Sequence, residues 1–454
     1  MALVPFRLSR PYNGRKLMLA SITCICFLWF YLSFNHPYTS YTSLRAPWDA
    51  HDSAGPAPDS VPQDTSSEQW LQKATDIFDD APLDSAAIRE VCAKTEWNAN
   101  LTFTCNNSGG GVGNQRNSIL NCLRYAISAG ASMTMPRMIL RNPANIADIW
   151  NRERTSFDYL FDESHFVESL RLSCPQLHIL KELESNDSSP IFVTPEKLSE
   201  EITPEGIDHP EEWRERFYGW LSNATDVQKP VVDLDRSYLQ YPIYSDPEAF
   251  ALDFGKVLKF RQDTRVVATT TLRNLVQKFD LHGDFRSPIW NHTFFGVHLR
   301  TERDSQQGWP PSLYEYSKYE TQSTNYLKQA VASGTTVMYV ASGNVQEIAR
   351  FAEDARAYNL SVTTKHQLLE GADKEKLEAF TFDQQALVDY LVLLKSSDFA
   401  GVGHSSFAWN IALWRHQLAR QRDHLNGPQL MSDELSQVYG TVRQYLEYAC
   451  CLWP

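Results

Sequence analysis

The sequence predicts an α/β fold with parallel sheets in two domains, and two observations support this. Apolar segments of strand type alternate with segments of helical period in two separate stretches, residues 101–135 and 294–418. Alternation of this kind implies parallel strands whose connecting helices cover both faces of a sheet. The length of 454 residues also exceeds that of one ordinary domain.

The first stretch opens in the manner of a nucleotide-binding unit. Residues 101–105 have strand composition and lead into a glycine-rich loop at 109–113. Behind the loop, apolar side chains recur at helical spacing at Ile119, Cys122, Leu123, Ala126 and Ile127. Residues 132–135 are typical of the next strand, which Pro136 ends. Strand, glycine loop, helix and strand in this order form the first unit of many nucleotide-binding sheets.

The second stretch predicts a longer series of alternating elements. Strands are expected from residue 294 onward and at 336–341, 361–364 and 398–402, with helices at 345–357, 383–395 and 407–418. The region between the two stretches is less regular, and helices are predicted there at 210–220 and 247–260.

The N-terminus predicts a membrane anchor. Residues 17–34 are uncharged and apolar, just long enough to span a bilayer. They follow a basic segment, so residues 1–16 are expected to be a cytosolic tail and the rest luminal. A cleaved signal peptide is the alternative, but no small-residue cleavage site follows the apolar run. The short span and the lack of an ER-retention tetrapeptide favour the Golgi membrane over the ER.

The luminal part is expected to begin with a stem and to continue as two domains. Residues 35–84, rich in Pro, Ser, Asp and Thr, are predicted to be the stem. The domains are expected at 85–285 and at 286–454. The formal charge of −13 argues against nucleic-acid binding. Glycosylation sequons agree with a luminal body; they begin at Asn100, Asn106, Asn186, Asn223, Asn291 and Asn359.

The luminal cysteines predict disulfides whose pairing the sequence leaves open. They are Cys92, Cys105, Cys122, Cys174, Cys450 and Cys451. Adjacent Cys450 and Cys451 are not expected to bond to each other, so that one of them is expected to tie the C-terminal end to an earlier segment. Cys122 lies on an apolar helix face, where a buried thiol is the alternative to a disulfide. A zinc site is not expected, because no Cys-x-x-Cys pair is present.

Charged residues follow the predicted strand that starts at Phe294. That strand ends in His298, Arg300, Glu302 and Asp304. Ligands of open α/β sheets bind at the carboxyl ends of strands, and the planar fork of an arginine suits a diphosphate. Surface charges after a buried strand are the alternative interpretation of this motif.

Two further motifs point to an anionic ligand. The loop and helix start at 109–116 include Gly111, Gly113, Asn114 and Gln115, and glycines there allow a ligand close to the backbone. The spacing fits neither a Walker P-loop nor the dinucleotide fingerprint. The third motif, between a predicted strand and helix, comprises His404, Ser405, Ser406 and Phe407. Serine there is first a helix N-cap, but the same amides and hydroxyls can hold an anion.

In this order the three motifs resemble the fucosyltransferases that use GDP-fucose, especially the protein O-fucosyltransferase-like family. The resemblance is specific in the motifs and loose over residues 109–416. It implies a GT-B glycosyltransferase that transfers fucose with inversion and without a metal cofactor. Its two Rossmann-like domains would face a cleft, with residues 85–285 on the acceptor side and residues 286–454 on the donor side. The expected partners are GDP-fucose, a protein or glycan acceptor and the membrane, reached by one N-terminal span.

The resemblance also implies roles for residues of the motifs. Arg300 would contact the donor diphosphate and act in catalysis, with His298 and Asp304 in support. The residues His404, Ser405, Ser406 and Phe407 would bind the donor. The loop residues Gly111, Gly113, Asn114 and Gln115 would lie in the cleft near the transferred sugar and the acceptor.

Two assignments depart from the family pattern or lack a motif. Some members carry a glutamate general base in the glycine-rich loop, where this chain has Asn114; Glu302 and Asp304 are the candidate replacements. A strongly dissociative transition state would need no base. Asp398, just before a predicted strand, is a candidate for binding guanine or ribose, although an ordinary strand-start aspartate fits equally well.

Two other functions remain open on the sequence. Residues 231–235 end in Asp233-Leu234-Asp235, an arrangement that holds manganese in another class of nucleotide-sugar transferase. A catalytically silent, membrane-anchored binding protein of the same fold is the third possibility. Intact Arg300, Ser405 and Ser406 argue against it.

Overall fold

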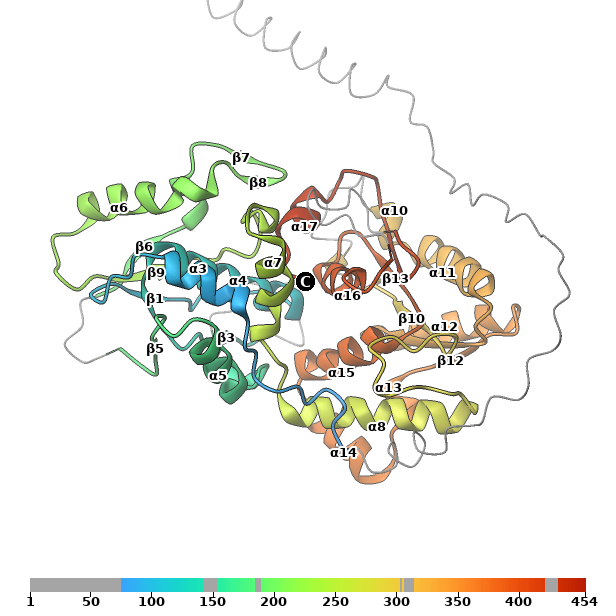
Figure 1. The fold of residues 1–454 in the computed structure, drawn as a ribbon. Helices are drawn as coiled ribbons and strands as arrows, with labels where there is room; N and C mark the ends of the chain where they lie inside the picture. The colour runs from blue at the N-terminus through green and yellow to red at the C-terminus, as the bar shows by residue number, and fades with distance from the viewer. Residues whose placement is uncertain (1–74, 142–152, 184–188, 303, 306–313, 421–431) are drawn as a thin grey trace, which may run out of the picture. The chain divides into compact units, whose positions relative to one another are not determined.

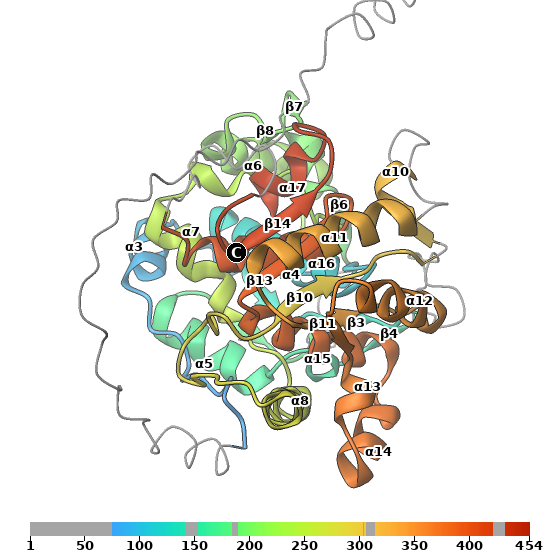
Figure 2. The same ribbon diagram turned by 90° about the vertical axis from the view of Figure 1, so that its right-hand side faces the viewer.

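A computed structural model describes residues 75–141, 153–183, 189–302, 304–305, 314–420 and 432–454. Its framework is two five-stranded sheets, ordered β5-β2-β1-β9-β6 and β12-β11-β10-β13-β14 (Figures 1 and 2). All pairings within both sheets are parallel. The predicted α/β fold with parallel sheets is therefore confirmed.

The first sheet is built around the glycine-loop unit. Its strands are β1 (Thr102–Thr104), β2 (Ser132–Thr134), β5 (Ile179–Leu180), β6 (Ile191–Val193) and β9 (Val231–Leu234). Two separate antiparallel pairs accompany this sheet. They are β3 (Met138–Ile139) with β4 (Arg154–Thr155), and β7 (Ile202–Thr203) with β8 (Gly206–Ile207). Its helices are α3 (Ala86–Lys94), α4 (Val112–Ala129), α5 (Glu163–Ser173), α6 (Trp213–Ala224) and α7 (Glu248–Phe254). Short 3₁₀ turns lie at Phe157–Tyr159, Pro195–Leu198, Pro210–Glu212, Ile243–Ser245 and Gly255–Val257.

The second sheet contains the strands β10 (Phe295–His298), β11 (Val337–Ala341), β12 (Ser361–Thr363), β13 (Asp398–Val402) and β14 (Ser436–Tyr439). Its helices are α10 (Tyr314–Ser317), α11 (Tyr319–Ser333), α12 (Val345–Arg356), α13 (Lys365–Leu368), α14 (Gly371–Ala379), α15 (Phe382–Lys395) and α16 (Ser406–His416). β10 and β11 are buried along their whole length, as expected of parallel strands covered by helices on both faces.

Helix α4 lies between the two sheets. It contacts α6 from the first half of the chain and α15 and α16 from the second half. Because neighbours surround it, its polar residues are buried along with its apolar ones. The helix ends at Gly130, whose φ of 71° is left-handed and whose amide donates to Ala126 and Ile127.

Two helices pack against the other half of the chain than the one to which the predicted boundary at 285 would assign them. Helix α8 (Gln262–Phe279), which the sequence analysis did not identify, runs along α15 of the second sheet (Figure 1). The C-terminal helix α17 (Leu446–Cys451) returns to contact β8. The predicted helix at 210–220 begins at Trp213 after a 3₁₀ turn, and the one at 247–260 ends at Phe254.

The residues just before the predicted body also belong to it. Asp76 accepts a hydrogen bond of 2.9 Å from buried Arg265 of α8, and Asp79 accepts one of 2.8 Å from Lys259. The predicted stem therefore gives way to packed structure by residue 75, earlier than the expected boundary at 84. The predicted anchor at 17–34 lies outside the described residues. The helices that the structure does describe include none long and apolar enough to cross a membrane.

The predicted disulfides are confirmed, but one expectation about their pairing is wrong and one alternative is excluded. Cys92 pairs with Cys174, Cys105 with Cys122 and Cys450 with its neighbour Cys451. Cys122 is therefore not a free thiol, because Cys105, just after β1, reaches its face of α4. The expectation that Cys450 and Cys451 would not bond to each other is wrong, because other contacts hold the C-terminal end.

The contacts that hold the C-terminal end centre on buried Arg116 of α4. Its guanidinium donates to the carbonyl oxygens of Trp453 at 2.6 Å and of Pro454 at 2.8 Å. The indole of Trp453 packs against Tyr241 and Phe254. No covalent link to an earlier segment is needed to keep these residues buried.

Candidate active site

The second sheet has its topological switch point between β10 and β13. From β10 the chain continues outward to β11 and β12, and then returns to the other side of β10 as β13 and β14. Ligands of open parallel sheets bind at the carboxyl ends of the strands that flank such a point. The two charged or hydroxyl-bearing motifs follow these two strands, His298 to Asp304 after β10 and Gly403 to Phe407 after β13.

A cavity of about 670 Å³ opens at this edge. From the first half of the chain it is lined by Gly111, Gly113 and Asn114, at the start of α4. From the second half it is lined by His298, Arg300, Glu302, Asp304, His404, Ser405, Ser406 and Phe407. The structure thus brings together at one cavity nearly all the residues that the three motifs predicted.

Two predicted site residues do not line the cavity. Asp398 begins β13 and therefore lies at the end of the strand opposite to the switch-point edge. This position removes the basis for assigning guanine or ribose to Asp398. Gln115 is buried in α4, where its Nε2 donates to the carbonyl oxygen of Gly110 at 3.0 Å. Its role in the structure is to hold the glycine loop.

Arg300 is held by two carboxylates. Its Nη1 lies 2.6 Å from Oε2 of Glu302 and 2.8 Å from Oδ1 of Asp304, and its Nη2 lies 2.6 Å from Oδ2 of Asp304. Burial disfavours the charged guanidinium, but the charge of Glu302 and the hydrogen bonds that Arg300 donates to Asp304 outweigh it and raise the pKa of Arg300. The side chain is fixed, and these hydrogen bonds leave its Nε for another partner.

The same contacts make Glu302 a weak base. Its Oε1 accepts hydrogen bonds from the amide of Gly343 at 2.7 Å and from the hydroxyl of Ser342 at 3.2 Å. Burial opposes ionisation, yet the charge of Arg300, its hydrogen bond and the one from the amide of Gly343 lower the pKa of Glu302 to about 2. A carboxylate of this kind does not take a proton near neutral pH. Asp304 is engaged through both oxygens, so neither candidate replacement for the missing general base fits the role.

Two histidines that line the cavity, His298 and His404, are uncharged at neutral pH. Burial lowers the pKa of His298 to about 4, against the opposing charge of Glu302. Burial and the charge of Arg300 lower the pKa of His404 to about 3. The ring of His298 packs against Phe407 with 4.7 Å between centroids, and Nε2 of His404 lies 3.2 Å from the hydroxyl of Ser317. Neutral rings in these places can accept or donate hydrogen bonds without repelling a phosphate-binding cation.

The N-terminus of α16 meets the N-terminus of α4 at the cavity. Ser405 caps α16 by accepting from the amide of Ala408 at 3.4 Å, and the hydroxyl of Ser406 donates to Oδ1 of Asn114 at 2.6 Å. A Cβ on Gly113 would come within 2.9 Å of the backbone carbon of Ser406. Glycine is therefore required at 113 for the two helices to approach. Their amides point a partial positive charge toward the cavity.

Several charged residues of the cavity escaped the sequence analysis. Arg141, which follows β3, lies 3.7 Å from Asp304 and 3.7 Å from Asp383 of α15. A buried ion pair joins Lys365 to Asp389. Arg141, Asp383, Lys365 and Asp389 all line the cavity. No local signal marked them, because Arg141 lies just after a two-residue strand that the sequence did not predict, and first-turn acids such as Asp383 commonly favour a helix start.

The aspartates of the alternative metal site lie elsewhere. Asp233 is buried in β9, where burial raises its pKa. Asp235 accepts hydrogen bonds from Asn107 and from the amide of Arg236. Neither lines the cavity. The position of these residues gives no support to a nucleotide site built on them.

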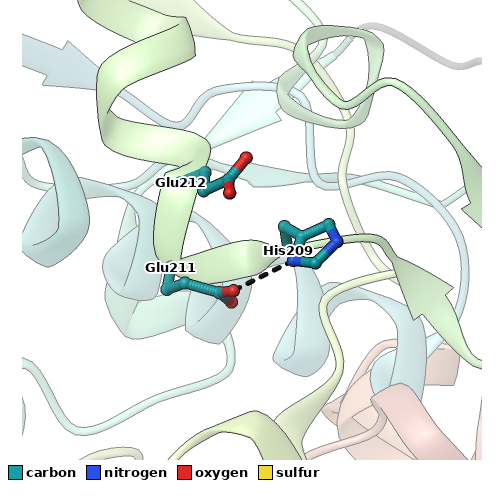
Figure 3. Close-up of side chains that lie close together, drawn as sticks. All are labelled: His209, Glu211 and Glu212. Atoms are coloured by element: carbon teal, nitrogen blue, oxygen red, sulfur yellow. Dashed lines mark hydrogen bonds and ion pairs between the residues drawn. The ribbon is translucent and has the colours of Figure 1, made fainter.

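One other group of possible ligands gathers among the described residues, at the start of α6. It consists of His209, Glu211 and Glu212 (Figure 3). All three are exposed, and Nδ1 of His209 is hydrogen-bonded to Glu211 at 3.1 Å. An exposed cluster of this kind is common without a bound ion and lies outside the cavity lining.

Comparison with known proteins agrees with the three motifs and with the cavity that they form. The model of the family described as GDP-fucose protein O-fucosyltransferase matches residues 101–418, which include all three motifs. A crystal structure of POFUT1 in complex with GDP-fucose is 14% identical, with 76% of this chain and 100% of that chain covered and a TM-score of 0.44. The fucosyltransferase NodZ from Bradyrhizobium is 14% identical over 67% of this chain and 90% of that chain, with a TM-score of 0.36.

No match is found among curated proteins. The family match spans more than half of the chain and confirms the resemblance that the three motifs indicated. The chain is a glycosyltransferase, and it belongs to the GDP-fucose protein O-fucosyltransferase family.

Proposed function

We propose that the chain transfers fucose from GDP-fucose to a hydroxyl group of a protein serine or threonine or of a glycan. Transfer would proceed with inversion and without a metal ion. The observation that carries the proposal is the position of Arg300 at the switch point, beside the N-terminus of α16. The family supports the donor, since its description names GDP-fucose.

The diphosphate of the donor fits the edge formed by β10 and β13. The amides at the start of α16 and the hydroxyl of Ser405 offer hydrogen bonds to phosphate oxygens. The hydroxyl of Ser406 would exchange Oδ1 of Asn114 for a phosphate oxygen when the donor binds. The Nε of Arg300 remains available while Glu302 and Asp304 hold its other nitrogens. Phosphate charge is thus met by groups of the chain itself, which supports transfer without a cation.

The acceptor fits the opposite side of the cavity. Gly111, Gly113 and Asn114 line the cavity together with the donor-side motifs. An acceptor hydroxyl entering there would attack the fucose carbon from the side away from the diphosphate. The glycosyl–oxygen bond then breaks with its electron pair going to GDP, and inversion follows. Arg300 would stabilise the charge that develops on the leaving phosphate.

We further propose that the enzyme is a single-pass type II protein of the Golgi membrane with a luminal body. The basic segment before the apolar residues 17–34 supports this orientation. The disulfides support an oxidising compartment. Several sequon asparagines are exposed and open to glycosylation, namely Asn100, Asn223, Asn291 and Asn359.

Release of nucleotide diphosphate from a panel of sugar donors tests the proposed activity. The purified full chain is incubated with GDP-fucose, GDP-mannose and UDP-glucose, with water serving as the hydroxyl acceptor. GDP release from GDP-fucose alone is expected, with the α anomer of fucose appearing first by NMR because the donor is β-linked. Faster turnover of the UDP-sugar would contradict the donor, and a β anomer as first product would contradict inversion.

A further inference from the structure

The cavity lacks an evident proton acceptor among the residues that the motifs identify. Four carboxylates line it within the described part of the chain: Glu302, Asp304, Asp383 and Asp389. Both oxygens of Glu302 and both oxygens of Asp304 accept hydrogen bonds, those of Asp304 from Arg300. Asp389 accepts from the hydroxyl of Tyr339 at 2.7 Å and from the ammonium group of Lys365. Three of the four are therefore occupied by strong donors.

Asp383 is the carboxylate that differs. It lies in the first turn of α15, is 2% exposed, and its Oδ1 has no hydrogen-bond partner among the described residues. The nearest cation, Nη1 of Arg141, is 3.7 Å from that oxygen, which is an ion pair too long for a hydrogen bond. A capping box of Thr381 and Gln384 fixes the turn. The position of Asp383 is thus set by α15, while Oδ1 keeps its capacity to accept a proton.

We propose that Asp383 is the general base of the transfer reaction. The proposal rests on the fucosyl transfer proposed above. The acceptor oxygen forms a bond to the anomeric carbon, and its proton passes to Oδ1 of Asp383. The bond between that carbon and the phosphate oxygen breaks, and its electron pair leaves with GDP. One proton is moved, one bond is made and one is broken, and no further reactant is needed.

The electrostatic environment of Asp383 suits this role. Burial raises the pKa of Asp383 to about 6, while the charge of Arg141 opposes the rise. A general base works best when its pKa lies near the operating pH. The titratable group that faces Asp383 from the neighbouring 3₁₀ turn is Tyr159, whose pKa is raised by burial and, to a lesser extent, by the charge of Asp383. The pKa of Glu302, at about 2, lies far below that of Asp383.

The ion pairs couple Asp383 to the leaving-group side. Arg141 lies 3.7 Å from Asp383 and, through its other Nη atom, 3.7 Å from Asp304, which holds Arg300. When Asp383 takes up the proton, its negative charge disappears. The positive charge of Arg141 then acts more strongly on Asp304, which weakens the hold of Asp304 on Arg300. The cation of Arg300 becomes more available to GDP as GDP gains negative charge.

The test compares Asp383→Asn with the wild-type full chain, again with water as acceptor. The variant is expected to hydrolyse GDP-fucose at least about 100-fold more slowly, with the dissociation constant for GDP unchanged within about threefold. The wild-type rate should fall as pH drops below about 6, and Asp383→Glu should recover part of the rate. Asp373→Asn, which removes a first-turn acid of α14 outside the cavity, should retain full activity.

The outcomes separate this proposal from the one on which it rests. Wild-type protein that neither binds GDP nor turns over GDP-fucose would overturn the proposed function and the base together. Wild-type turnover combined with a near-normal rate in Asp383→Asn would overturn the base alone. If the variant fails to fold, the wild-type pH profile decides, because a rate that stays flat between pH 5 and 8 would contradict a base with this environment.

Discussion

Replacing Gly113 with alanine should separate the two helix N-termini that form the cavity. The added Cβ would lie 2.9 Å from the carbonyl carbon of Ser406, 3.0 Å from its oxygen and 3.0 Å from Nδ2 of Asn410. Two of these atoms belong to the backbone of α16, so a side-chain rotation cannot relieve the contact. The start of α16 must move away from α4, together with the hydroxyls proposed to bind the diphosphate.

The magnitude follows from two opposing terms. Overpacking a well-filled contact costs about 1–3 kcal/mol. The better helix propensity of alanine offsets up to about 1 kcal/mol, less in a first turn. We therefore expect Gly113→Ala to lower the free energy of unfolding by about 1–2 kcal/mol. GDP affinity should fall by about tenfold, since 1.4 kcal/mol of lost phosphate contacts corresponds to that factor.

Gly219 provides a matched control in the same chain. It lies inside α6, and a Cβ built there meets nothing within 4 Å. Gly219→Ala should therefore stabilise the protein by up to about 1 kcal/mol and leave GDP binding unchanged. Urea denaturation and calorimetric titration with GDP measure both variants. If Gly113→Ala matches wild type in stability and in affinity, the helix contact does not form as the structure has it.

Three further predictions concern the charges. Arg300→Lys should reduce turnover at least about 100-fold. It should also lower the free energy of unfolding by about 1–3 kcal/mol in chemical denaturation, because the two buried carboxylate partners lose hydrogen bonds. Near-normal turnover would show that Arg300 does not stabilise the leaving group. GDP binding should persist in EDTA, whereas loss on chelation and recovery with manganese would favour Asp233 and Asp235. Because burial lowers the pKa values of His298 and His404 to about 4 and 3, the folded state binds fewer protons than the unfolded state below pH 6.5. Asp383 and Glu196, whose pKa values burial raises to about 6 and about 7, act in the opposite direction. Because the two histidines are shifted further in total, the melting temperature should fall between pH 6.5 and 4, and a rise on acidification would refute the assignment.

The sequence predicted those parts of the site that follow strands. Arg300 and Ser405 occupy positions just beyond buried strands, and strand ends in a parallel sheet converge on one edge. Their neighbourhood could therefore be inferred from local pattern alone. Gly113 was identified as part of a loop, but its requirement comes from contact with Ser406, a residue distant in the sequence.

Residues whose position depends on tertiary packing could not be predicted in the same way. Arg141 reaches the cavity from a loop of the first half of the chain and pairs with acids of the second half. Asp383 resembles an ordinary first-turn acid until its burial is known. Asp398 failed for the converse reason, because a strand-start residue lies at the wrong edge of a parallel sheet. Helix α8 went unnoticed, since its role becomes clear only from its packing along α15.

The central claim is that this cavity binds a guanosine diphosphate sugar through Arg300 and the start of α16. Calorimetric titration of the purified full chain with GDP, GDP-fucose and UDP in EDTA tests it most directly. Saturable binding of both guanosine ligands is expected, at least about tenfold tighter than that of UDP, a difference of 1.4 kcal/mol. Tighter binding of UDP than of GDP, or no binding of GDP at millimolar concentration, would contradict it.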